Sequence, residues 1–170
     1  MKKLFLMLFF LPLVGFTQEP EFKKGIPEDL DKEKIIFLKH EPIKLSEFEE
    51  ETKSTEYILQ RQKSHNRILS QSNGKLEIAA MDYPFEYAIT TPSTYFSLAE
   101  ASYKYVLQSS VYQYEHLMAQ PPEDELLVFK YFIFDMQNNI AYEVFRLDEM
   151  KVYDFKLVIK KLNKAIKAAE

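Results

Sequence analysis

The sequence predicts an α+β domain: an antiparallel sheet of about five strands, with three helices packed mainly on one of its faces. Three observations support this fold class. Residues 126–147 have the pattern of a β-hairpin, and residues 154–169 have the pattern of an amphipathic helix. The whole chain then reads as strand, helix, two strands, helix, two strands, helix, an order that favours an α+β domain.

The hairpin pattern is the most apolar part of the chain outside the N-terminus. Its two runs, LLVFKYFIFD and IAYEVFRL, are separated by MQNN, and asparagine tolerates the positive φ of a tight turn. A two-residue loop places Ile133 opposite Val144, and a four-residue loop places it opposite Tyr142. Both registers give the same two faces, because side chains alternate along a strand. The first face carries Leu127, Phe129, Tyr131, Ile133, Ile140, Tyr142, Val144 and Arg146, and the second carries Val128, Lys130, Phe132, Phe134, Ala141, Glu143, Phe145 and Leu147.

The second face of the hairpin is a candidate interaction surface. Helices on one side of a sheet bury only one face, and we assign them to the more uniformly apolar first face. Phe132, Phe134 and Phe145 then need another cover, since burying each phenylalanine is worth about 1.5–3 kcal/mol. Three covers are open: residues 18–34, a second copy of the chain, or another protein. A partner or self-association is favoured, because residues 18–34 contribute few apolar side chains.

The N-terminus resembles a bacterial signal peptide over residues 1–17. Lys2 and Lys3 precede an apolar stretch of about 13 residues, short of the roughly 20 that span a bilayer. We expect cleavage between Thr17 and Gln18, with an uncleaved anchor as the alternative. Residues 18–34 then form an irregular arm and residues 35–170 a single globular domain. The chain has no cysteine, which excludes disulfides, a thiolate metal site and a lipid-modified cysteine.

The remaining elements follow from local patterns. Ser46 with Glu49 fits a capping box, and Asn73-Gly74 is a typical helix stop. Residues 97–118 favour a helix, with a pair of strands as the rival interpretation because the composition is β-like. The predicted strands outside the hairpin are 35–39, 75–81 and 85–90, and the predicted helices are 46–72, 97–118 and 154–169.

Catalytic and metal-binding motifs are absent from the sequence. The three histidines, His40, His65 and His116, are far apart and occur in no HExxH or close His-x-His pattern. No G-x-S-x-G motif is present, and three glycines leave no room for a glycine-rich nucleotide loop. We therefore predict no cofactor, no metal and no catalytic residue.

Two further segments could form binding surfaces, residues 97–118 and residues 154–169. If residues 97–118 are helical, Tyr105, Tyr112 and His116 share an exposed strip that could bind a sugar or a protein, although aromatic residues at helical spacing are more often core. The lysines of residues 154–169 could meet anionic lipid, but a solvated face is favoured. Removing Lys2 and Lys3 from 22 basic residues leaves 20 against 26 acidic ones, a net charge of −6 that disfavours nucleic acid.

These observations favour a small exported domain, periplasmic or extracellular, that binds a ligand or protein without catalysis. The membrane would be a partner only during export. A cofactor-free hydrolase, with histidines or carboxylates assembled by the fold, is the alternative from another class. Clustered histidines or two acids in a deep pocket would favour the hydrolase, and an exposed aromatic patch would favour binding. An inhibitor of the immunity type would also fit the acidic charge, but no motif supports it.

Overall fold

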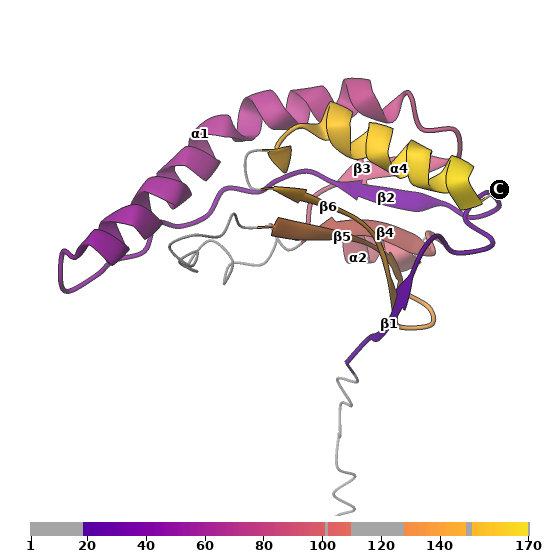
Figure 1. Cartoon of the computed structure of the whole chain (residues 1–170), viewed down its shortest axis with the longest axis horizontal. Helices are drawn as coiled ribbons and strands as arrows, with labels where there is room; N and C mark the ends of the chain where they lie inside the picture. Colours follow the sequence, from indigo (N-terminus) through magenta and orange to yellow (C-terminus); the bar gives the residue numbers. More distant parts are fainter. Residues whose placement is uncertain (1–18, 101, 110–127, 149–150, 170) are drawn as a thin grey trace, which may run out of the picture.

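The computed structural model describes residues 19–100, 102–109, 128–148 and 151–169 (Figure 1). The predicted signal peptide lies outside these residues, as do Tyr112 and His116. No helix among the described residues has the length and apolar character needed to cross a membrane.

The fold is α+β, as predicted, but the sheet formed by the described residues is mixed and has six strands. The strand order is β1-β6-β5-β4-β2-β3. The strands are β1 (Glu21–Lys24), β2 (Ile35–Leu38), β3 (Tyr87–Thr90), β4 (Tyr105–Ser109), β5 (Val128–Asp135) and β6 (Ile140–Asp148). Only the pairs β4–β5 and β5–β6 are antiparallel, whereas β2 runs parallel to both β3 and β4 and β1 runs parallel to β6. The predicted antiparallel sheet of about five strands is therefore wrong in detail.

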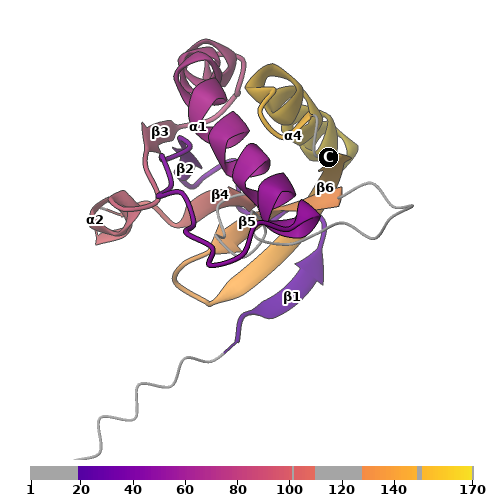
Figure 2. The same cartoon turned by 90° about the vertical axis from the view of Figure 1, so that its left-hand side faces the viewer.

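Helices cover both faces of the sheet, rather than mainly one. The long helices α1 (Lys53–Ala80) and α4 (Phe155–Ala169) lie side by side on one face, and the short helix α2 (Tyr95–Glu100) lies on the other (Figures 1 and 2). Alternation along β2 explains the two layers: Ile35 and Phe37 belong to the main core with the long helices, whereas Ile36 and Leu38 pack in a second cluster with α2 residues.

The main core lies between the sheet and the long helices. Its buried members from the central strands and α4 include Phe37, Leu107, Phe129, Tyr131, Ile133, Phe155, Val158, Ile159 and Leu162. The predicted apolar side of residues 154–169 is confirmed where Phe155, Val158, Ile159, Leu162 and Ile166 are buried, whereas Ala165 is half-buried and Ala169, at the end of the helix, is exposed.

The hairpin has the four-residue loop, with Ile133 opposite Tyr142 and with Asn139 at a φ of 56°. One feature of β6 was not predicted. Tyr131 pairs with Phe145 and Phe132 pairs with Glu143, so Val144 is an extra residue that forms a β-bulge. Because of the extra residue, the side chains of β6 after Val144 point to the opposite face from the one predicted. Phe145 therefore stacks on Tyr131 at 4.7 Å on the helix side, and the prediction that it lies on the second face is wrong.

Helix α1 differs from its prediction at both ends. It begins after Thr52, whose side chain forms a capping box with Thr55, rather than at Ser46. It also continues through Gly74, so the strand predicted at 75–81 is wrong. Leu76, Ala79 and Ala80 of the last turns are buried in the core. Their burial outweighs the cost of about 1 kcal/mol for a glycine inside a helix.

The polar stripe along α1 holds the extended segment that follows β2. Side-chain amides of α1 hydrogen-bond to both the backbone N–H and the backbone C=O of one residue, at 2.9–3.0 Å. These pairs are Asn73 with His40 and Asn66 with Ile43, and Gln62 bonds the N–H and the hydroxyl of Ser46. This face of α1 therefore carries few apolar side chains, because amide hydrogen bonds rather than apolar contacts attach the segment after β2 to it.

The helix predicted over residues 97–118 ends early. Helix α2 stops at Glu100, Ser102 adopts a φ of 76°, and Tyr105–Ser109 is strand β4. The rival strand interpretation is right for this part, and the remainder of the segment lies outside the described residues. Tyr105 consequently has no place on an exposed helical strip. It is 1% exposed within the sheet.

Candidate functional site

The best candidate for an interaction surface is the part of the second sheet face formed by β1, β5 and β6. We call it the outer sheet face and define it by Phe22, Lys24, Val128, Lys130, Phe132, Glu143 and Arg146. Phe22 is 64% exposed and Val128 54% exposed, although both are large apolar residues. The Phe22 ring meets the half-buried Phe132 ring edge to face, with centroids 5.8 Å apart. This pair forms the apolar centre of the surface.

Charged side chains surround that centre. Glu143 accepts a hydrogen bond from Nε of Arg146 at 2.6 Å, and its other oxygen lies 3.6 Å from Nζ of Lys130. The bond from Arg146 is the main reason that the pKa of Glu143 is lowered, so the acid is ionised at neutral pH. Lys24 pairs with Glu143 in the register between β1 and β6. Three cations and one carboxylate therefore frame the phenylalanines.

Strand β1 also leaves one edge of the sheet exposed. The backbone N–H groups of Glu21 and Gly25 donate to the backbone oxygens of Asn139, in the hairpin turn, and Glu143, in β6, at 3.0 and 3.1 Å. Because successive residues of a strand direct their backbone groups to opposite sides, those of Phe22 and Lys24 point away from the sheet. All four residues of β1 are exposed. The edge next to the apolar centre thus presents backbone donors and acceptors.

The structure separates the residues that the sequence grouped into one interaction face. Phe132 is on the outer sheet face. Phe134 lies on the same side of β5 but packs against the second core cluster, which consists of Ile36, Leu38 and Val106. Phe145 is on the helix side, and Tyr105 is buried in the sheet. Phe22 was considered only as a cover, because the sequence does not show that residues 21–24 form an edge strand.

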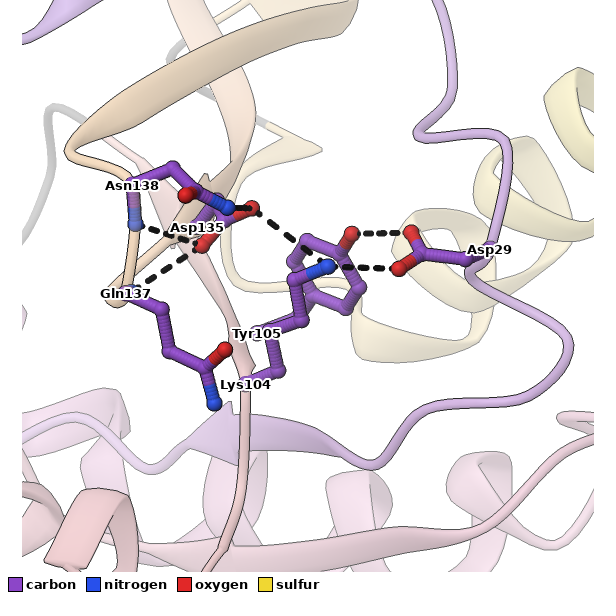
Figure 3. Close-up of polar contacts among 6 residues, drawn as sticks. All are labelled: Asp29, Lys104, Tyr105, Asp135, Gln137 and Asn138. Carbon is purple, nitrogen blue, oxygen red and sulfur yellow. Dashed lines mark hydrogen bonds and ion pairs between the residues drawn. The ribbon is translucent and has the colours of Figure 1, made fainter.

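A polar network that the sequence did not predict links the start of β4 to the hairpin turn (Figure 3). Nζ of Lys104 lies 2.5 Å from Asp29 and 3.8 Å from Asp135, and the hydroxyl of Tyr105 donates to Asp29. Partial burial opposes ionisation of Asp29, but the hydrogen bonds from Lys104 and Tyr105 outweigh it and lower its pKa. Asp135 in turn accepts the backbone N–H groups of Gln137 and Asn138.

The chemistry of this network favours a structural role. The hydrogen bond to Asp29 raises the pKa of Lys104, so the amine stays charged and cannot act as a base. Burial and the same carboxylate raise the pKa of the Tyr105 hydroxyl. The network holds two segments against the start of β4: the residues that precede β2, through Asp29, and the hairpin turn, through Asp135. No short sequence motif could reveal it, because Asp29 and Lys104 are 75 residues apart.

The fold brings two of the three histidines together, in the core beneath α1. His40 and His65 are each 3% exposed, and their ring centroids are 5.9 Å apart. Nδ1 of His65 lies 2.7 Å from the Tyr153 hydroxyl, and Nε2 lies 2.9 Å from the backbone oxygen of Glu41. Burial, assisted by His65, lowers the pKa of His40 to about 3, and burial lowers the pKa of His65 as well. Both rings are therefore neutral at pH 7.

The surroundings of the histidine pair are aromatic. The His40 ring is 4.9 Å from the Tyr153 ring and 5.0 Å from the Phe155 ring. Among the described residues, no group of three or more His, Cys, Asp or Glu side chains could hold a metal ion. The pair is thus placed as part of the core, where substrate has no access to the imidazoles.

Comparison of the chain with protein-family models, curated proteins and solved structures gave no match. The assignment of function therefore rests on the geometry described above.

Proposed function

We propose that the chain is an exported, non-catalytic module that binds a protein through the outer sheet face. The observation that carries the proposal is the pair Phe22–Phe132. An edge strand keeps one phenylalanine 64% exposed directly beside another on the sheet. Exposed aromatic clusters with a polar rim are typical of interaction sites, because aromatic residues dominate binding energy at interfaces.

The composition of the surface indicates the chemistry of the partner. The apolar centre calls for apolar side chains, and the three cations around one carboxylate favour acidic residues beside them. The free backbone groups of β1 favour an extended segment that adds a strand to the sheet. A partner segment with alternating apolar and acidic residues satisfies all three features. It would place its apolar side chains on Phe22 and Phe132.

The hydrolase alternative has one observation in its favour, the proximity of His40 and His65. That pair differs from an active site in two respects. Each histidine is 3% exposed, and the ring nitrogens of His65 face a tyrosine hydroxyl and a backbone oxygen rather than a carboxylate. Catalysis needs a base near the substrate with a pKa close to the working pH, whereas burial lowers both pKa values here.

The double variant Phe22→Ser, Val128→Ser tests the proposal. Both side chains are largely exposed, so the melting temperature should change little, whereas the apolar contact with the partner should be lost. The measurement is capture of binding proteins from an envelope extract by the immobilised chain, with mass spectrometry, beside size-exclusion chromatography for self-association. We expect at least a tenfold loss of the retained species, corresponding to about 1.4 kcal/mol or more.

Leu45→Ser is the matched control. Leu45 is 36% exposed and lies away from the outer sheet face, after β2. It should retain the same species as the unaltered chain. Equal retention by all three proteins, or equal loss in the control, would contradict the proposal.

A further inference from the structure

The charges of the chain are segregated between the helix layer and the rest of the molecule. Helix α1 carries five basic and two acidic residues, and α4 carries five lysines and no acidic residue. The two helices together have a net charge of +8, in a chain whose net charge is −4, so the remaining residues carry −12. The helices lie side by side above the sheet, which places this positive charge on one side of the molecule (Figures 1 and 2).

Four of the five lysines of α4 are exposed, whereas Lys161 is half-buried and donates from Nζ to the backbone oxygen of Arg146 at 3.0 Å. The five residues are Lys156, Lys160, Lys161, Lys164 and Lys167, opposite the buried stripe of the helix. They line a surface hollow of about 580 Å³ that Asp82, just beyond α1, borders. None of the ion pairs between described residues involves any of the five. Their charge is thus not neutralised by the described part of the chain. Lys63, Arg67 and Lys75 extend the positive surface along exposed positions of α1.

Two large apolar side chains stand exposed at the end of the same layer. Ile78 is 70% exposed and Met81 is 74% exposed, three residues apart at the end of α1. They adjoin the lysine-lined hollow, because Asp82 follows Met81 and its backbone oxygen accepts a hydrogen bond from Asn163 of α4 at 2.7 Å. The layer therefore combines a field of lysines with protruding aliphatic groups.

From this combination we infer that the helix layer docks on an anionic lipid surface, with Ile78 and Met81 entering the headgroup region and the lysines meeting the phosphates. Lysines around exposed aliphatic residues are typical of proteins that lie on a bilayer, where burial of apolar area and attraction to anionic lipid act together. A nucleic acid would not explain the exposed Ile78 and Met81, and an acidic protein would not need them to protrude. The inference is independent of the proposed function, since the outer sheet face is on the opposite side of the sheet.

The test is sedimentation of the chain with phosphatidylcholine vesicles that contain phosphatidylglycerol, and with vesicles of phosphatidylcholine alone. Binding should require the anionic lipid and should fall as salt is added. Each lysine near such a surface contributes a factor of about five to partitioning, so Lys160→Gln, Lys164→Gln should partition about 25-fold less. Ile78→Ser, Met81→Ser should also lose binding, including at high salt, while its melting temperature is retained.

Lys23→Gln, Lys32→Gln is the matched control, because it removes the same charge from exposed positions outside the helix layer. It should bind almost as well as the unaltered chain. Equal binding to neutral vesicles, an equal loss in the control, or a preference for polyglutamate or duplex DNA over anionic vesicles would each overturn the inference.

Discussion

Leu162→Ala should lower the free energy of unfolding by about 2–5 kcal/mol, the range for removing a large aliphatic side chain from a packed core. Leu162 is 0% exposed, in the middle of the α4 stripe that rests on the sheet. The neighbouring positions around it, Ile159 and Ile166, are buried as well, so the cavity has few ways to collapse. Chemical denaturation followed by circular dichroism measures the change.

Lys160→Gln, Lys164→Gln is the control for this prediction, since these residues lie on the outer side of the same helix. It should change the free energy of unfolding by under about 0.5 kcal/mol. If the two variants had similar stabilities, the assignment of α4's inner and outer faces would be wrong.

Acidification from pH 6.5 to 5 should destabilise the folded chain by about 1.6 kcal/mol through His40 alone. The pKa of His40 is about 3 in the folded state and 6.5 as its ordinary value, so below pH 6.5 the unfolded chain binds more protons. The loss is about 1.4 kcal/mol per pH unit until the folded pKa is reached. His65 adds to it, because burial lowers its pKa in the same direction. Denaturation midpoints measured across this pH range give the slope.

His40→Phe separates the histidine from the other titrating groups. A phenylalanine ring fits the aromatic contacts with Tyr153 and Phe155 and cannot be protonated. The mean slope between pH 6.5 and 5 should fall by about 1.1 kcal/mol per pH unit relative to the unaltered chain. An unchanged slope would show that His40 is not the group that couples folding to acid.

The sequence predicts best the elements whose burial pattern is local. Helix α4 has one apolar and one basic side at a period of 3.6, and its buried residues are those expected. The hairpin is likewise predicted by two apolar runs around an asparagine-rich turn, and the four-residue loop is one of the two registers considered. In both elements the periodic pattern of apolar residues lies within the element's own sequence, so the element can be recognised from a short segment alone.

The wrong predictions concern features that depend on contacts between residues far apart in the sequence. Gly74 is a helix stop by local rules, but the burial of Leu76 and Ala79 against the sheet extends α1 past it. Parallel pairing of β2 with β3 and β4 depends on the crossovers through α1 and α2, not on strand composition. The bulge at Val144 leaves no mark in the sequence and moves Phe145 to the helix side.

The candidate site shows the same division. Phe132 lies on the second face, as predicted, whereas Phe134 packs against the second core cluster and Tyr105 is in the core. Phe22 belongs to the outer sheet face only because residues 21–24 pair with β6, which is a contact between distant parts of the chain. The polar network around Lys104 was missed for the same reason.

Phe132→Glu is the most direct test of the proposal that the outer sheet face is an interaction surface, with Phe134→Glu on the same strand as the comparison. Both side chains are half-buried, but Phe132 lies beside the exposed Phe22, whereas Phe134 packs against the second core cluster of Ile36, Leu38 and Val106. We predict that Phe132→Glu keeps its melting temperature and loses binding or association in size-exclusion chromatography, and that Phe134→Glu has a lower melting temperature. A collapse of stability in Phe132→Glu, in a chain that is monomeric throughout, would show that Phe132 is ordinary core and would contradict the claim.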